Sequence, residues 1–266
     1  MTIRVCLGGI SGWAGSALAK GVHQTDDIEV VAGVSRQNAG RTLSEVLGLP
    51  DLQGMVNATA AEALTTPCDV FVEYTKPDVA KANVLAALRH GAHVVIATSG
   101  LTDADYAEIH EAALQHGKGV LAVGNFSMAV VLLQKCAELV AKYIPRYEII
   151  DYASAGKKDA PSGTARELAY RLSQIQQPQL TVPIDQMQGP TESRGVTLNG
   201  VQVHSIRLPG HVISAEVLFG DLDQRLSIRY DAGTSPEVYV EGALLAIRKV
   251  GTFTGLKRGL DSVMDF

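Results

Sequence analysis

The feature that most constrains the fold is a glycine-rich turn directly after the first strand-like segment. The apolar segment Ile3–Leu7 leads into the sequence GGISGWAG, which opens a helical pattern over Ala14–His23. Glycines there let the backbone approach a pyrophosphate, whose charge faces the unpaired amides of the helix N-terminus. A tight strand-to-helix turn also needs glycine for steric reasons alone, so the position after the first strand carries the argument. It predicts a dinucleotide site at Gly9, Ser11, Gly12, Trp13, Ala14 and Gly15.

Strand-like and helix-like segments alternate through the first half of the chain. Continuously apolar runs are typical of parallel strands that helices cover on both faces. The expected strands are Ile3–Leu7, Ile28–Val34, Val70–Glu73, His93–Ala97 and Gly119–Val123, and the expected helices are Ala14–His23, Val79–Arg89 and Asp103–His116. The alternation predicts an α/β domain with a doubly wound parallel sheet.

The pattern changes after about residue 125. Strand candidates now cluster without intervening helices, which indicates a second, α+β domain with an antiparallel or mixed sheet. The expected helices are Met128–Tyr143 and Thr164–Leu172, and the expected strands are Glu148–Tyr152, Val201–Leu208, Val212–Phe219 and Gln224–Asp231. A final helical pattern over Glu237–Val250 is compatible with either domain.

Charge and residue spacing exclude several function classes. The net charge is −5 and no block of Lys and Arg occurs, which argues against a nucleic-acid partner. No apolar run reaches the roughly 18 residues of a membrane span, and the N-terminus has no signal-peptide pattern, so we expect a cytoplasmic protein. Cys6, Cys68 and Cys136 lie far apart, and the seven histidines form no pair with metal-ligand spacing. We expect three buried thiols, no metal and a small-molecule partner.

The end of the second expected strand carries no acidic residue. An acidic side chain about 20 residues after the glycine turn would bind the ribose 2′-hydroxyl of NAD. The chain has Ser35 and Arg36 there, and a guanidinium suits the 2′-phosphate of NADP. A solvated arginine is the alternative, and Lys76 and Arg41 are weaker candidates for the phosphate. Ser35 and Arg36 therefore predict a preference for NADPH, with NADH as the second option.

Polar turns follow the other strands of the first half. In an open parallel sheet, ligands lie beyond the carboxyl ends of the strands. These turns therefore add candidate cofactor contacts at Tyr74, Thr75, Ala97, Thr98, Ser99, Gly100, Asn125 and Phe126.

The most distinctive string of the second half is KKDAPSGTA, which starts at Lys157 and opens a helical pattern. Hydroxyl groups and free amides at a helix N-terminus can hold a carboxylate, and a lysine in front adds charge. In the alternative, Asp159 or Ser162 is a helix N-cap with proline in the first turn. The residues alone leave both open.

At this string the chain resembles the dihydrodipicolinate reductase family, the 4-hydroxy-tetrahydrodipicolinate reductases of bacterial lysine and diaminopimelate biosynthesis. The matching motifs run from the glycine turn through TKP, ATSG, NFS and KKDAPSGTA to HSIRLPG, EVLFG, IRYD and GALLAIRK. The resemblance implies a Rossmann-like nucleotide domain at residues 1–126 plus 237–266 and a substrate domain at 127–236 whose sheet builds a homotetramer. It also implies hydride transfer from NAD(P)H to a cyclic carboxylated imine or enamine.

The resemblance also assigns residues to roles. It implies nucleotide contacts at Gly9, Gly12, Gly15 and Arg36, nicotinamide contacts at Thr98, Ser99 and Gly100, and substrate contacts at Lys157, Ser162, Gly163, Thr164 and Arg207. Ser154, a position at which the family differs, is a further candidate substrate contact of this chain.

One departure from the family pattern bears on the chemistry. The family motif begins with two adjacent histidines, one of them proposed as the proton donor, and this chain has Ala153 and Ser154 there. Two further positions that carry histidine in relatives are Ser214 and Tyr230. A positioned acid typically contributes 10²–10⁴-fold to the rate. Lys157 is the best remaining catalytic donor, because a desolvated lysine can release a proton near neutral pH.

Several alternatives stay open on the sequence alone. Ser154, Tyr152, Tyr230 or a water are weaker donors, and a substrate that enters as an iminium needs no acid. The chain could reduce a different cyclic imine, or it could be a nucleotide-binding homologue without activity. His211, which follows Gly210, is the one histidine worth testing.

Overall fold

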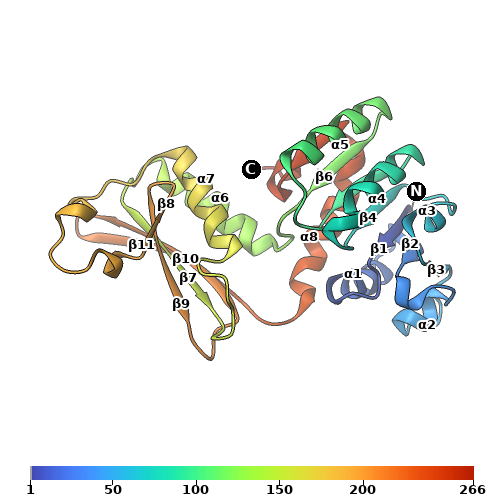
Figure 1. Ribbon diagram of the computed structural model, residues 1–266, viewed down its shortest axis with the longest axis horizontal. Coiled ribbons are helices and arrows are strands. Elements are labelled where there is room, and N and C mark those ends of the chain that lie inside the picture. Colours follow the sequence, from blue (N-terminus) through green and yellow to red (C-terminus); the bar gives the residue numbers. More distant parts are fainter. Residues whose placement is uncertain (1) are drawn as a thin grey trace. The chain divides into compact units, whose positions relative to one another are not determined.

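The computed structural model describes residues 2–266, which divide into two compact units (Figure 1). The first unit contains the residues up to Met128 together with Pro236–Phe266, and the second contains Ala129–Ser235. The final helix belongs to the first unit, so the chain returns there after completing the second. The roles that we assigned to the two predicted domains stay predictions.

The first unit is built on a parallel sheet of seven strands in the order β12-β6-β5-β4-β1-β2-β3. The strands are β1 Ile3–Gly8, β2 Ile28–Val34, β3 Met55–Asn57, β4 Val70–Glu73, β5 His93–Ile96, β6 Gly119–Ala122 and β12 Gly255–Arg258. The helices are α1 Trp13–His23, α2 Leu43–Leu47, α3 Ala60–Ala63, α4 Pro77–Arg89, α5 Asp103–Gln115 and α8 Val240–Lys249. The predicted Rossmann-like α/β sheet is confirmed.

The order of the strands places the predicted nucleotide turn at the switch point of the sheet. β1 lies between β2 and β4, and the chain runs outward from it in both directions. In such sheets the crevice at the carboxyl ends of the central strands binds the ligand. Every residue of β4 and β6 is buried, as their continuous apolar runs predicted.

The second unit is an α+β fold with a mixed sheet in the order β11-β10-β7-β9-β8. Only β7 and β9 pair in parallel. The strands are β7 Tyr147–Ala153, β8 Val196–Leu198, β9 Val201–Arg207, β10 Ile213–Asp221 and β11 Gln224–Ala232, and the helices are α6 Met128–Ala141 and α7 Gly163–Ile175. Both helices cover one face of the sheet (Figure 1), where Leu133 and Leu168 pack with Ile149, Val217 and Phe219.

The prediction of a buried thiol is wrong for two of the three cysteines. Cys6 is buried, but Cys68 is only partly buried and Cys136 is exposed. Cys136 lies on α6, which also exposes Leu132 and Leu139. This helix has more apolar residues than its core contact covers, so an apolar setting in the sequence did not imply burial. Among the helices within residues 2–266, none is long and apolar enough to cross a membrane.

Candidate active site

The glycine turn has a geometry that only glycine can adopt. Gly9 has φ 74°, and a Cβ there would lie 2.3 Å from the carbonyl oxygen of Tyr74. A Cβ at Gly15 would lie 2.3 Å from the carbonyl oxygen of Gly9. Gly12 is the N-cap of α1 and donates its amide to Gly9 at 2.9 Å. The turn is therefore as tight as close approach of a phosphate requires.

The same turn leaves hydrogen-bond donors free. Within residues 2–266, no acceptor is bonded to the amides of Trp13, Ala14 and Gly15, which form the first turn of α1. Unpaired amides and the positive end of the helix dipole favour an anion. These residues fit a dinucleotide pyrophosphate.

A cavity of about 340 Å³ lies beside this turn. It brings together predicted residues from three segments, namely Gly9, Ser11, Gly12, Ser35, Arg36, Tyr74 and Thr75. The Ser11 and Ser35 hydroxyl oxygens are 2.7 Å apart. Thr59 and Asn83 also line the cavity and were not predicted from the sequence. Their capping and helical positions carry no pattern that indicates a ligand.

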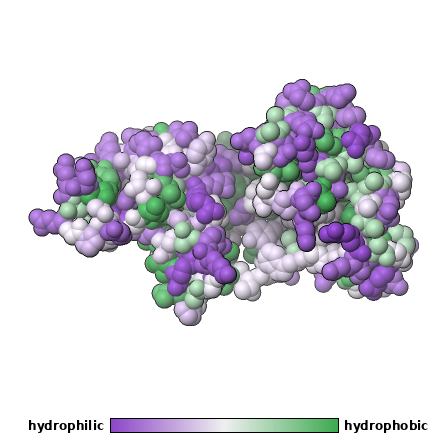
Figure 2. Space-filling model, in the orientation of Figure 1, coloured by the Kyte–Doolittle hydropathy of each residue, from purple (hydrophilic) through white to green (hydrophobic). Residues whose placement is uncertain are grey.

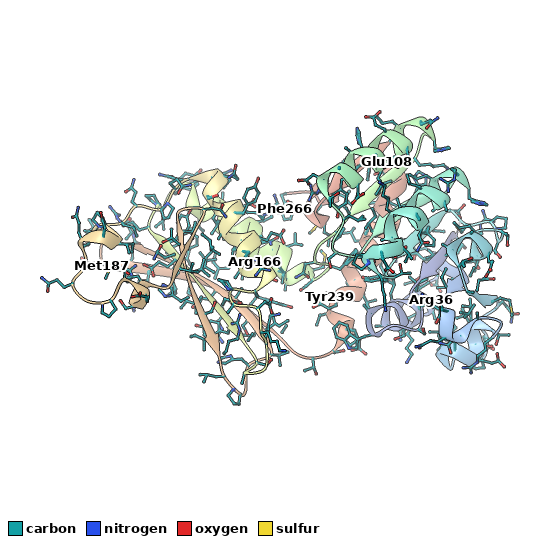
Figure 3. The ribbon with its side chains drawn as sticks, in the orientation of Figure 1. Arg36, Glu108, Arg166, Met187, Tyr239 and Phe266 are labelled. Carbon is teal, nitrogen blue, oxygen red and sulfur yellow. The ribbon has the colours of Figure 1, made fainter. Side chains whose placement is uncertain are left out.

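The charge around the cavity is basic. Arg36 and Lys76 line it, whereas no acidic side chain of the described residues does. Arg36 is exposed, lies near α1 and α2 in Figure 3, and makes no hydrogen bond or ion pair with the rest of residues 2–266. Arg41 differs, because its guanidinium binds Asn38 Oδ1 and the carbonyl of Glu45. The Arg36 guanidinium, just after β2, is therefore free to bind a phosphate.

The remaining predicted cofactor residues follow β5 and β6 and do not line this cavity. The Thr98 hydroxyl donates to the Glu73 carbonyl at 3.1 Å, and the Phe126 ring lies 5.8 Å from the Tyr74 ring. Asn125 Oδ1 accepts the amide of Ser127 at 2.9 Å. Ala97 donates its amide to the Glu73 carbonyl, and Ser99 and Gly100 follow in the same turn. Their contact with a cofactor stays a prediction.

Tyr239, just before α8, brings a further aromatic ring to the nucleotide turn. Its ring centroid lies 5.9 Å from that of Trp13, in an edge arrangement. Trp13 is 59% exposed and is the one tryptophan of the chain. Its fluorescence is therefore a direct probe of the glycine turn, where the pyrophosphate is predicted to bind.

In the second unit, Ser162 begins α7 as an N-cap. Its hydroxyl oxygen accepts the amide of Ala165 at 3.2 Å and donates to Asp151 Oδ1 at 2.7 Å. Its amide donates to Asp151 Oδ2 at 2.8 Å. The capping alternative is thus present in the structure. A contact between Ser162 and a substrate stays a prediction.

The donors that remain free belong to the next two residues. Within the described chain, no acceptor is bonded to the amides of Gly163 and Thr164 or to the Thr164 hydroxyl. Lys157 lies in the preceding loop, where its Nζ is 2.8 Å from Asp159 Oδ1 and lowers the pKa of that carboxyl group. A helix N-terminus with two free amides, a hydroxyl and a nearby ammonium suits a carboxylate.

Arg207 on β9 holds this loop from the side. Its Nη2 atom lies 2.7 Å from Asp151 Oδ2 and 2.7 Å from the Asp159 carbonyl oxygen. Asp151 on β7 is 1% exposed and also accepts the Ser162 hydroxyl and amide. Asp151 was not predicted as a site residue, although a carboxylate at an inward position of a strand is unusual enough to be a signal.

The weaker proton-donor candidates have other partners. The Tyr152 hydroxyl donates to Glu216 Oε2 at 2.8 Å, and its ring packs 5.2 Å from His211. Burial, and then the bond to Glu216, raise the pKa of Tyr152. Tyr230 packs against the hydrophobic core of the second unit, while Ser154 is exposed.

Within residues 2–266, no three His, Cys, Asp or Glu side chains are grouped as in a metal site.

Comparison with known proteins shows one family over both units. The model for "Dihydrodipicolinate reductase, N-terminus" matches residues 3–126, and the model for its C-terminus matches residues 129–264. The 4-hydroxy-tetrahydrodipicolinate reductase of Moorella thermoacetica is 36% identical over 100% of this chain and 99% of its own. That of Halalkalibacterium halodurans is 34% identical over 99% of this chain and 100% of its own.

Solved structures show the same likeness. A dipicolinate-bound dihydrodipicolinate reductase from Paenisporosarcina sp. TG-14 superposes with a TM-score of 0.88 at 28% identity, covering 99% of this chain and 100% of its own. An amine dehydrogenase from Mycobacterium smegmatis has a TM-score of 0.69 at 15% identity, over 100% of this chain and 97% of its own, and shares the fold.

Proposed function

The chain belongs to the dihydrodipicolinate reductase family, and we propose that it reduces 4-hydroxy-tetrahydrodipicolinate, with NADPH preferred over NADH. Members of this family are NAD(P)H-dependent oxidoreductases of lysine and diaminopimelate biosynthesis. One observation carries the proposal for this chain. The free amides of Gly163 and Thr164 lie at the start of α7, directly after the loop that carries Lys157, and a helix N-terminus of this kind suits a substrate carboxylate.

The residues of the second unit hold and protonate the substrate in this proposal. The amides of Gly163 and Thr164 bind one carboxylate of the cyclic imine, and the Lys157 ammonium binds the same end by charge. The cofactor, when bound at the glycine turn, supplies the hydride. Reduction of the ring also needs a proton at the neighbouring atom, and Lys157 Nζ donates it in place of the absent histidines.

Turnover with the named substrate tests this function. We expect the purified protein to oxidise NADPH when freshly generated 4-hydroxy-tetrahydrodipicolinate is added, measured by the loss of absorbance at the reduced nicotinamide band. Quenching of Trp13 fluorescence measures NADPH binding separately. Background turnover together with tight NADPH binding would contradict the assignment. Screening other carboxylated cyclic imines would then distinguish a reductase of another imine from an inactive homologue.

The preference for NADPH is predicted to depend on Arg36. Arg36→Ala removes the one arginine that lines the cavity, so the ratio of kcat/KM for NADPH to that for NADH should fall by about 10-fold, the value of one charge-assisted bond to phosphate. Steady-state kinetics with both nucleotides measures this ratio. Arg41→Ala is the matched comparison, because Arg41 is held by Asn38 and Glu45. A fall confined to Arg41→Ala would refute the assignment of Arg36.

We further propose a cytoplasmic homotetramer that forms through the sheet of the second unit. The face of this sheet away from α6 and α7 carries Leu218, which is 37% exposed, opposite Ser227 on β11. Leu222 and Leu226 at the β10–β11 hairpin are also exposed, and Figure 2 shows hydrophobic residues at the surface of this unit. Such exposure supports an interface. Light scattering of the wild type and of Leu218→Glu tests the tetramer.

A further inference from the structure

The end of β4 contains a buried carboxyl group that the proposed reaction does not use. Glu73 is 0% exposed, in a strand whose other residues are apolar. Its Oε1 accepts the amide of Thr75 at 2.6 Å and also the Thr75 hydroxyl, and its Oε2 accepts Asn83 Nδ2 at 2.8 Å. The Thr98 hydroxyl lies 3.3 Å from Oε1. Both carboxyl oxygens are therefore occupied by donors.

A group of this kind is costly to bury. Desolvation raises the pKa of Glu73, while the hydrogen bonds from Thr75 and Asn83 act in the opposite direction. An apolar residue would complete the strand without that cost. The role of the carboxyl group can be inferred from its donors, Thr75, Asn83 and Thr98, because these come from separate segments near the nucleotide turn.

The donors of Glu73 belong to the walls of the cofactor cavity. Thr75 and Asn83 line the 340 Å³ cavity, and the amides of Ala97 and Thr98 bond to the Glu73 carbonyl oxygen. The following residue, Tyr74, presents its carbonyl oxygen to Gly9, whose missing side chain allows the contact. One residue thus joins the turn after β4, the turn after β5 and the helix α4.

We propose that Glu73 is a positioning residue for the nicotinamide cofactor, and that it acts by fixing Thr75 and Asn83 at the cavity and Thr98 in the turn after β5. The inference rests on the proposed function in one respect, namely that the cavity binds this cofactor. Glu73 does not touch the ligand. Its removal is expected to change the affinity for NADPH more than the rate of the bound complex.

The variant Glu73→Gln tests this role with a change of one atom. The new side-chain carbonyl still accepts from Thr75, but the new amide nitrogen is a donor where Asn83 Nδ2 also donates, so Asn83 must turn its amide over and give up its 3.4 Å bond to Thr75 Oγ1. We expect the Kd for NADPH, measured by Trp13 quenching, to rise about 10-fold, because Thr75 and Asn83 no longer hold each other in place at the cavity. At saturating NADPH, kcat should stay within about threefold of the wild type.

A swapped pair separates positioning from general loss of stability. In the double variant Glu73→Gln/Asn83→Asp, the amide at position 73 faces a carboxylate at position 83, so the hydrogen bond is restored with reversed roles. We expect it to recover most of the lost NADPH affinity. Asn83→Asp alone places two carboxylates together and should bind NADPH more weakly than Glu73→Gln.

Asp69→Asn provides the matched control. Asp69 precedes β4 at its opposite end, where it accepts from Arg4 at 2.8 Å, and it lies away from the cavity lining. It should retain wild-type NADPH affinity. An unchanged Kd in Glu73→Gln would overturn the proposal, and so would equal loss in the single and swapped variants. Because Kd is measured without imine, a wild type that binds NADPH but reduces no 4-hydroxy-tetrahydrodipicolinate would contradict the proposed function and not this one.

Discussion

Replacement of Lys157 by alanine is expected to lower kcat/KM for 4-hydroxy-tetrahydrodipicolinate by about 10²–10⁴-fold, the contribution of a positioned general acid. The change removes the ammonium group that lies 2.8 Å from Asp159 Oδ1, in the loop that precedes the free amides of α7. It also removes a charge that binds the substrate carboxylate. NADPH affinity should stay at the wild-type value, because Lys157 lies in the second unit and the glycine turn in the first.

Two further variants assign the loss to the proton or to the charge. Lys157→Arg keeps a cation, but a guanidinium does not release its proton near neutral pH. We expect KM for the imine to recover in this variant while kcat remains low. Lys158→Ala is the matched control, since Lys158 is exposed and its side chain makes no hydrogen bond or ion pair within residues 2–266. Wild-type kcat in Lys157→Ala would refute Lys157 as the donor and favour a water or an iminium substrate.

Long elements of the fold were predictable because each carries several periods of its pattern. β4 and β6 appear as buried apolar runs, and α1, α4 and α5 as helices within a few residues of their predicted bounds. The short elements α2, α3, β3, β8 and β12, with three to five residues each, were not predicted. A segment of that length contains about one period, so its structure depends on capping and on neighbouring strands.

The two sites were predictable to different extents. Ser11, Ser35, Arg36 and Thr75 meet at one cavity because parallel strands end at the same edge of a sheet. The carboxyl groups of Glu73 and Asp151 were missed, since each bonds to donors that are distant in sequence. Such pairings cannot be inferred from composition or residue spacing. The hydrogen bonds that support a site therefore become visible only in the folded structure.

Removal of the Asp151 carboxyl group is expected to have two effects. It should destabilise the second unit, and it should disable the carboxylate cradle, that is, the free amides of Gly163 and Thr164 with Lys157 in the preceding loop. Asp151 is 1% exposed and is the counter-ion of Arg207, which is 14% exposed. In Asp151→Ala the guanidinium keeps its backbone carbonyl acceptors but stays buried without a counter-ion, so the free energy of unfolding should fall by about 3–5 kcal/mol. Urea denaturation followed by circular dichroism measures it. Asp151→Asn should lose less, because one side-chain oxygen still accepts from Ser162.

The double variant Asp151→Ala/Arg207→Met separates these two effects. Without a charge on either side, much of the lost stability should return, because an apolar pair of similar volume is tolerated where a lone charge is not. Activity should not return with it. Ser162 would have lost both of its bonds to Asp151, and the Asp159 carbonyl would have lost its bond to Arg207, so the loop that carries Lys157 would no longer be held. Recovery of kcat/KM together with stability would mean that the ion pair supports only the fold, whereas recovered stability with low kcat/KM and normal NADPH binding would show that it positions the cradle.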